Sequence, residues 1–240
     1  LNAFTAAYGH LMVFLSPSNQ TLPELNAYLY ENWYIDVKNI TLTESGANAL
    51  SGDGRNISAT YSEDNTPGGS LTKTLRDLES TPKAVVFNSL ALQIAEGGDN
   101  SNASTFASYV LTTSDNAVAL KNGEETDRGR FGLMALSGKT IYDENNESHD
   151  AFALVSGSTD FAGTEYLDSA SYANRDILYS AMQAMGKENV PSNIDIRKFE
   201  DTSLDLTSAQ ANNWTIVFAA VIPFVFLVMG IVVYIRRRHL

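Results

Sequence analysis

The strongest hydrophobic pattern in the chain is an uncharged run near its C-terminal end, from Trp214 to Ile235. At about 1.5 Å of rise per residue, a helix of this length crosses a hydrocarbon core of about 30 Å. A buried core helix is usually shorter and keeps one polar face, and this run has none. Pro223 and Gly230 are tolerated inside membrane helices. The pattern therefore predicts one transmembrane helix over residues 214–235.

The flanks of this run predict its orientation. Aromatic residues stand at its two ends, where the membrane interface favours them, and basic residues follow directly. The positive-inside rule places the tail, residues 236–240, in the cytoplasm. The polar residues 191–213 would form a stalk outside it. The residues expected to anchor the chain in the bilayer are Trp214, Pro223, Gly230, Tyr234, Arg236, Arg237 and Arg238.

The preceding part, residues 1–190, mixes strand patterns with helical ones. The apolar run Leu11–Leu15 predicts a buried strand, and Leu22–Trp33 carries apolar residues at helical spacing. A strand at Tyr34–Val37 completes a strand–helix–strand order, which is typical of α/β domains. We therefore expect one extracytoplasmic α/β domain. Further strands are predicted at Asn56–Tyr61, Ala84–Phe87, Tyr109–Thr112, Phe131–Leu136 and Ala151–Val155.

The last helix before the stalk has the clearest amphipathic pattern. Apolar residues recur at helical spacing from Ile177 to Met185, which predicts one buried face. We expect Asn174 to be the N-cap, because its side chain can accept from the free N–H groups of the first turn. Gly186 is expected to end the helix.

Composition limits the classes of function. The chain of 240 residues has a net charge of −12, and the basic tail means that the outer part is the acidic one. Such a surface disfavours binding to nucleic acid. The absence of cysteine excludes disulfides, thiolate metal sites and a cysteine nucleophile. No export signal follows Leu1, so we expect the sequence to be the C-terminal part of a longer protein.

Several motifs imitate catalytic sites without the required spacing. Ser137–Thr140 resembles the end of a phosphate loop, but Leu133 stands where that loop needs glycine, so no ATPase chemistry is expected. Ser156–Ser158 follows a predicted strand but lacks the Gly-x-Ser-x-Gly pattern of a nucleophile elbow. His10 and His149 lie in an apolar strand and a charged turn, a poor basis for a catalytic triad.

The densest group of acids lies in a turn, Asp143–Asp150, between two predicted strands that we expect to be sheet neighbours. It has neither zinc-ligand spacing nor the full ligand series of a calcium loop. We interpret these acids as a solvated turn and expect no metal and no cofactor. The residues are Asp143, Glu144, Glu147 and Asp150.

Three polar residues near the end of the domain are candidates for a ligand site or for structural turns. Asp160 follows Ser158 at the carboxyl end of a predicted strand, where ligands collect in open α/β sheets. The structural alternative, which we favour, is that Asp160 caps the next turn, Phe161 enters the core and Asn174 caps the last helix.

The order of several short motifs resembles a known family. Leu154–Phe161 reads Leu-Val-Ser-Gly-Ser-Thr-Asp-Phe and is followed by Tyr166-Leu167 and Asn174-Arg175-Asp176. This order resembles the V-x-G-x-[ST]-D-F … N-x-D block of the GldG-like, gliding-motility-type auxiliary components of ABC transporters. The segment Gly9–Leu15 and the end of the chain, with Ile222-Pro223 and Gly230, are similar to the same family.

The resemblance implies a partial glutamine-amidotransferase-like domain outside the cytoplasm, followed by one C-terminal transmembrane helix. Without cysteine, such a domain lacks the amidotransferase nucleophile, so the expected role is non-enzymatic. The implied role is an accessory subunit of a bacterial ABC-type transport system, in contact with the permease and ATPase subunits and with the lipid bilayer. A membrane-anchored hydrolase or glycan-binding module that uses Ser158 and Asp160 stays open, as does a simple anchor.

Overall fold

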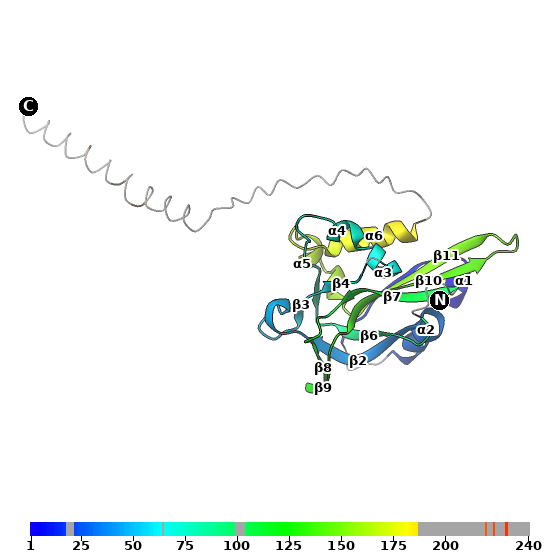
Figure 1. The fold of residues 1–240 in the computed structure, drawn as a ribbon, viewed down its shortest axis with the longest axis horizontal. Helices are drawn as coiled ribbons and strands as arrows, with labels where there is room; N and C mark the ends of the chain where they lie inside the picture. Colours follow the sequence, from blue (N-terminus) through cyan, green and yellow to red (C-terminus); the bar gives the residue numbers. More distant parts are fainter. Residues whose placement is uncertain are drawn as a thin grey trace, which may run out of the picture. The chain divides into compact units, whose positions relative to one another are not determined.

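The computed structural model describes residues 1–17, 22–63, 65–98 and 104–186, together with Ala219, Pro223 and Met229. The chain divides into two units, Leu1–Ser192 and Asn193–Leu240. The first unit has a mixed α/β fold with a large sheet (Figure 1). This confirms the predicted α/β class at its coarsest level.

The strands of the first unit are β1 Leu11–Phe14, β2 Ile35–Thr43, β3 Asn56–Ser58, β4 Thr60–Tyr61, β5 Val85–Phe87, β6 Leu90–Ile94, β7 Thr105–Thr112, β8 Val118–Lys121, β9 Glu124–Arg128, β10 Gly132–Tyr142 and β11 Ser148–Ser156. Its helices are α1 Asn2–Ala6, α2 Pro23–Trp33, α3 Pro67–Ser70, α4 Lys73–Arg76, α5 Thr164–Leu167 and α6 Asn174–Met185. Two 3₁₀ turns, η1 Gly46–Asn48 and η2 Asp160–Ala162, complete the described elements.

The main path of the large sheet runs β1-β11-β10-β6-β2-β8-β9. β7 also pairs with β10, and β4 pairs with β7. Among the described strands, β1 and β11 are the parallel pair, and the other pairings are antiparallel. The expected strand–helix–strand unit is therefore not a parallel one. β11, β10 and β6 lie between β1 and β2, and the alternation of directions makes β2 run opposite to β1.

The helix α2 confirms the helical spacing at the start of the chain. Pro23 occupies its first turn, where the missing N–H is harmless. The helix ends when Tyr34 takes a left-handed conformation (φ 55°) and donates its N–H to the carbonyl of Leu29. The expected strand Tyr34–Val37 therefore begins one residue later, as β2, and continues to Thr43.

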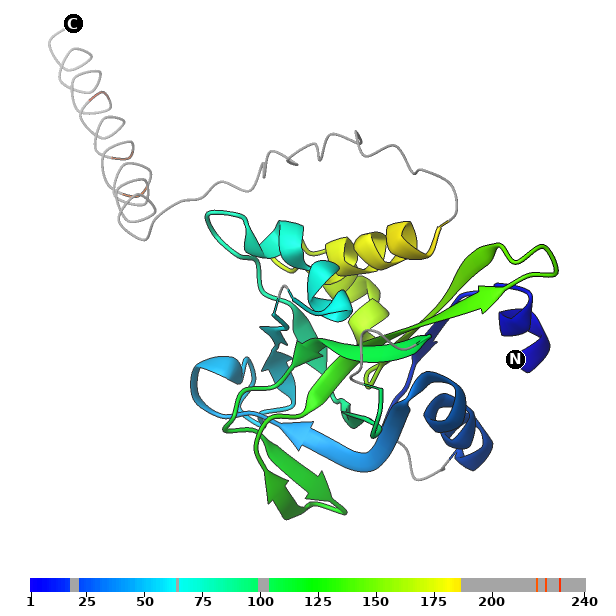
Figure 2. The ribbon, with the colours of Figure 1, turned by 45° about the vertical axis from the view of Figure 1, so that its right-hand side comes forward.

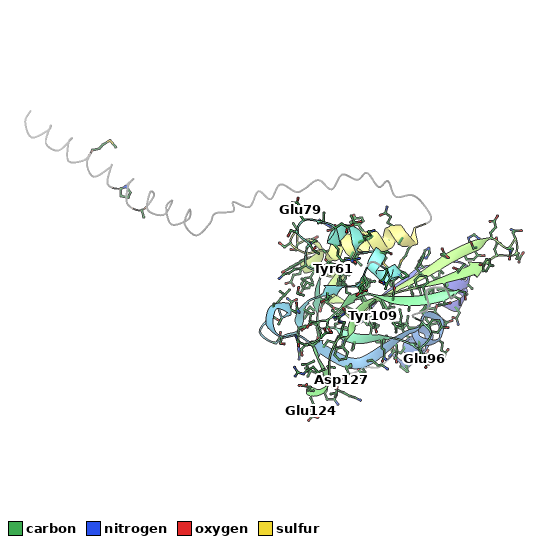
Figure 3. The ribbon with its side chains drawn as sticks, in the orientation of Figure 1. Tyr61, Glu79, Glu96, Tyr109, Glu124 and Asp127 are labelled. Atoms are coloured by element: carbon green, nitrogen blue, oxygen red, sulfur yellow. The ribbon has the colours of Figure 1, made fainter. Side chains whose placement is uncertain are left out.

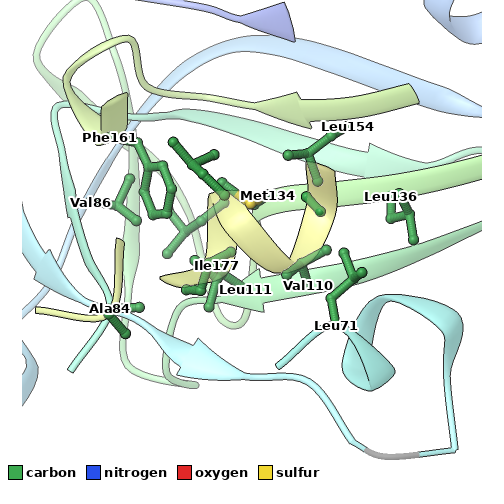
Figure 4. Close-up of a cluster of buried hydrophobic side chains, with 14 of the residues drawn as sticks. Leu71, Ala84, Val86, Val110, Leu111, Met134, Leu136, Leu154, Phe161 and Ile177 are labelled. Carbon is green, nitrogen blue, oxygen red and sulfur yellow. The ribbon is translucent and has the colours of Figure 1, made fainter. Parts of the chain in front are cut away.

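Apolar side chains pack on both faces of the sheet, with α6 over one face and α2 over the other (Figures 1 and 2). Leu154 of β11 joins the cluster under α6, while its neighbour Val155 joins the cluster under α2. This alternation is the normal consequence of the two-residue period of a strand. Figure 4 shows Phe161 and Ile177 in the α6 cluster, together with Leu154.

The strands β10 and β11 form the predicted neighbouring pair. Their register runs from Met134 opposite Ser156 to Tyr142 opposite Ser148, so both strands are longer than the apolar pattern suggested. The added residues lie toward the turn between the two strands and are mostly polar, so a search for apolar residues does not detect them.

The β8–β9 hairpin was not predicted. Asn122 and Gly123 connect the two strands with positive φ values of 54° and 86°. These are the conformations of a type I′ turn, for which Asn-Gly is the preferred sequence. The dipeptide was therefore an available signal, although the exposed strand Glu124–Arg128 shows no hydrophobic alternation.

The predicted stalk (191–213), transmembrane helix (214–235) and tail (236–240) lie outside the described residues, except for Ala219, Pro223 and Met229. Within the described part of the chain, no helix is both long and apolar enough to cross a bilayer.

Candidate functional site

An open cleft of about 600 Å³ lies on the first unit, and Asp160 forms part of its wall. It is lined by the loop before β3 and by the segment from η2 into α5, together with Asn56 of β3 and Phe87 of β5 (β3 and α5 are labelled in Figure 1). These two segments are far apart in the sequence, and only the fold brings them together. The lining residues are Ser51, Gly52, Asp53, Asn56, Phe87, Asp160, Gly163, Thr164, Glu165 and Tyr166.

Local hydrogen bonds organise the loop side of the cleft. Asp53 Oδ1 accepts from Ser51 Oγ at 2.5 Å and from the Arg55 N–H at 3.1 Å. The Ser51 hydroxyl in turn accepts from the Asn56 N–H at 3.2 Å. The hydrogen bond from Ser51, followed by that from the Arg55 backbone, lowers the pKa of Asp53. Asp53 is therefore an anion at neutral pH.

The helical side of the cleft carries two further acids around a tyrosine. The Gly163 N–H donates to the Asp160 carbonyl at 2.8 Å, which closes η2 and directs the chain into α5. Burial raises the pKa of Tyr166, and the charges of Glu165 and Asp160 raise it further. Both carboxylates therefore act on the same phenol, which indicates a negative potential on this side.

Ser158 is fully buried and is not among the residues that line the cleft. Its hydroxyl donates to the carbonyl of Phe87, and its N–H donates to Ser156 Oγ at 3.2 Å. The intervening Gly157 passes so close to β6 that a Cβ there would lie 2.2 Å from the Leu90 carbonyl oxygen. The segment Ser156–Ser158 is therefore packed directly against the backbone of β6.

Asn174 does not cap α6 with its side chain, so the expected N-cap role is wrong. The N-cap residue is Ala173, and Asn174 is fully buried as the first residue of the helix. Asn174 Nδ2 donates to the carbonyls of Val85 (2.7 Å) and Phe161 (3.1 Å), while Oδ1 accepts from the Val85 N–H (2.9 Å). The amide thus pairs with the backbone of β5 as a neighbouring strand would.

We also expected Phe161 to enter the core and Asp160 to cap the next turn, and only the first expectation is confirmed. Phe161 is fully buried in the core, as predicted. Asp160 begins η2, but this turn has no side-chain cap, and the residue contributes its backbone carbonyl instead. Its carboxylate is therefore available to the cleft. The position of Asp160 after the carboxyl end of a strand does not by itself indicate a ligand site. Such crevices belong to open parallel sheets, and β11 has the antiparallel neighbour β10.

The two histidines of the first unit stand away from Ser158. His10 Nδ1 accepts from the Phe152 N–H at 3.1 Å. Phe152 lies four residues before the end of β11, which is about 13 Å at the usual rise of a strand. His149 lies still further along the same strand. Neither ring is placed to activate the Ser158 hydroxyl.

The charged turn between β10 and β11 is held by its own backbone. Asp143 Oδ1 accepts from the N–H groups of Asn145 (2.9 Å) and Glu147 (2.8 Å), and these bonds, with that from Glu147 the larger, lower its pKa. His149 Nε2 lies 3.6 Å from Asp143 Oδ2. Donor atoms of Asp143, Glu147 and His149 come within 4.8 Å of one another. Asp150 is not part of the turn: it lies in β11 opposite Thr140 of β10 and accepts from the Thr140 hydroxyl at 2.9 Å. The predicted turn Asp143–Asp150 is therefore too long, since β11 already begins at Ser148.

Sequence reasoning found one acid of the cleft wall, Asp160, and missed the other two, Asp53 and Glu165. Asp53 lies in a Gly- and Ser-rich stretch that has the composition of any surface loop.

Comparisons with protein-family models and with curated proteins give no match for this chain.

Proposed function

We propose that this chain is a non-enzymatic, membrane-anchored accessory subunit of a bacterial ABC-type transport system of the export kind. The observation that best supports the proposal is the use of Ser158 and Asn174. Both side chains are fully buried, and both bond to backbone groups of β5. Residues used in this way hold the fold together, which leaves the surface of the domain for contact with other proteins.

In this proposal, the first unit is a partial glutamine-amidotransferase-like domain outside the cytoplasm. Residues 214–235 cross the bilayer, and the basic tail lies in the cytoplasm. The permease is the membrane partner, and a separate ATPase subunit supplies the energy. The cleft beside α5 is the surface of the first unit that faces a partner or cargo.

Co-purification tests this proposal directly. The full-length protein, tagged at its C-terminus, is extracted from its native membrane in mild detergent, and the bound proteins are identified by mass spectrometry. We expect an ABC ATPase and a polytopic permease to be retained. A matched control carries an unrelated apolar helix of equal length in place of residues 214–235, and should retain less permease. Recovery of the tagged protein alone would contradict the proposal.

A second candidate, an anchored hydrolase or glycan-binding module, is favoured by one observation: Asp160 lines an open cleft. A hydrolase that uses Ser158 and Asp160 should lose its activity on Ser158→Ala or Asp160→Asn while remaining folded. Under the accessory-subunit proposal, Ser158→Ala lowers the stability instead, because it removes a buried hydrogen bond. Asp160→Asn should leave the stability unchanged.

A further inference from the structure

We propose that two copies of this chain associate through the free edge of β1, so that their large sheets join into one. The inference goes beyond the proposed function, because it assigns an interaction surface and names its partner, a second copy of the chain. β1 ends the main path of the sheet, and its strand neighbour among the described residues is β11.

β1 has the sequence of an interior strand but the position of an edge strand. Its residues, Leu11 to Phe14, are all apolar, which is typical of strands that are covered on both faces. Leu11 and Val13 pack against the cluster under α2, and Met12 and Phe14 pack against the cluster under α6. All four residues are only half-buried. Both layers of the core therefore end at β1, and a further strand beside it would extend and cover them.

The backbone of β1 offers hydrogen-bonding groups on the same free side. The N–H of Leu15 donates to the carbonyl of Ser156 at 2.9 Å, so the backbone groups of Leu15 point toward β11. Because these groups alternate in direction along a strand, those of Met12 and Phe14 point away from β11. No strand of the described ranges pairs with them. Free N–H and C=O groups on an edge are a template for another strand.

The opposite edge of the sheet is protected in a way that β1 is not. β9 is exposed along its whole length, and its sequence, Glu-Glu-Thr-Asp-Arg, is almost entirely charged. Glu124 and Asp127 of this strand are labelled in Figure 3. Charged side chains on an edge strand discourage pairing with another chain. β1 carries no charge, so the contrast between the two edges indicates that β1 is the one that pairs.

The lack of charge on β1 favours a second copy as the partner. The chain has a net charge of −12, so two copies repel each other over much of their surface. Two apposed β1 strands, in contrast, place no like charges opposite each other. Each copy also brings two half-open core layers, and joining the edges covers the layers of both copies at once. Two-fold symmetry is the commonest arrangement of identical subunits.

Two-fold symmetry predicts a register for the joined strands. With Val13 on the axis, Met12 of each copy stands opposite Phe14 of the other, and each of these pairs exchanges two N–H···O=C bonds. The outward backbone groups of Met12 and Phe14 are then all used. Val13 faces Val13 of the second copy as a non-hydrogen-bonded pair, with Cα atoms about 4.5 Å apart.

Disulfide cross-linking tests this register, because the chain has no cysteine of its own. Single cysteines are introduced into the full-length protein in detergent, a mild oxidant is added, and the covalent dimer is measured on a non-reducing gel. We expect Val13→Cys to give this dimer, since its Cα spacing suits a disulfide. Met12→Cys should give at least about tenfold less, because the two positions are diagonal neighbours about 7–8 Å apart. Glu124→Cys, on the protected edge, is the control for random collisions and should also give little.

Light scattering of the unmodified full-length protein gives a second measurement that does not depend on the folding of a variant. We expect a protein mass of two chains at high concentration. A mass of one chain at every concentration would overturn the proposal. So would a yield from Val13→Cys no higher than that from Glu124→Cys, which would mean random collisions. Equal yields from Val13→Cys and Met12→Cys would also overturn it, since the strands would not meet in the stated register.

Discussion

Asn174→Ala should destabilise the first unit far more than the loss of a helix cap would. The substitution removes the partner of three backbone groups: the N–H and carbonyl of Val85 and the carbonyl of Phe161. Asn174 is fully buried, so water cannot replace it without rearrangement. At about 1–3 kcal/mol for each of the three buried groups left without a partner, the expected loss is roughly 3–9 kcal/mol. Loss of an N-cap alone costs about 1 kcal/mol.

Urea unfolding can distinguish the loss expected for the buried amide from the smaller loss expected for an N-cap. Trp214→Phe provides the background, so that fluorescence reports the buried Trp33 alone. In that background, the free energy of unfolding of Asn174→Ala is compared with that of Asn116→Ala, at an exposed position. The control should change it by less than about 0.5 kcal/mol. Asn174→Asp keeps the acceptor for the Val85 N–H but puts a carboxylate oxygen where Nδ2 donates to the Val85 and Phe161 carbonyls, and should be at least as damaging.

A loss near 1 kcal/mol for Asn174→Ala, with an unchanged urea dependence, would refute this account of the side chain. It would mean that the residue serves α6 locally and that β5 does not depend on it.

Three further predictions concern stability. Gly157→Ala should cost several kcal/mol in urea unfolding, because its Cβ would meet a backbone oxygen at 2.2 Å, whereas Gly52→Ala, with nothing within 4 Å, should be near neutral. Burial raises the pKa of Tyr61 to about 12. Because a phenol in the unfolded chain ionises near pH 10, the contribution of Tyr61 to stability should be intact below about pH 10 and lost between about pH 10 and 12, by roughly 2 kcal/mol. Tyr61→Phe should lack this loss in an alkaline unfolding series, and an unchanged profile would contradict the assignment. Glu44→Ala should cost about 2–4 kcal/mol in thermal unfolding, because the nearly buried carboxylate accepts from the Ser114 N–H (2.6 Å) and hydroxyl (3.0 Å); a loss below 1 kcal/mol would contradict it.

The spacing of apolar residues predicted the helices and strands that bury one face, and it missed those that are exposed on all sides. The helices α2 and α6 and the β10–β11 pair follow from apolar spacing, since each of them buries an apolar face. β9 is exposed along its whole length, so its only signal was the Asn-Gly turn before it. The relative direction of the strands could not be predicted from local sequence patterns, because β1 pairs with the distant β11 and not with the strand that follows α2.

The candidate site was predictable only in part, for a related reason. Asp160 stood out because it follows a strong strand, but its meeting with Asp53 depends on the packing of η2 and α5 near β3. Asn174 carries the sequence signature of a helix cap, and the fold uses its amide for β5 instead. A short polar side chain bonds to whichever backbone groups packing brings near it, and one sequence does not reveal which these are.

The pairing of β1 with β11 bears on the order of events while the chain is being made. Leu11 is paired with Ala153, so β1 meets the sheet neighbour that the described residues give it only after about 140 further residues have been added. At a synthesis rate of about 5–20 residues per second, the wait is roughly 7–30 s. During that time, the apolar residues Leu11–Phe14 are without the strand that they pair with in the fold. The nascent chain therefore offers a binding segment to holding chaperones, and the segment disappears when β11 emerges.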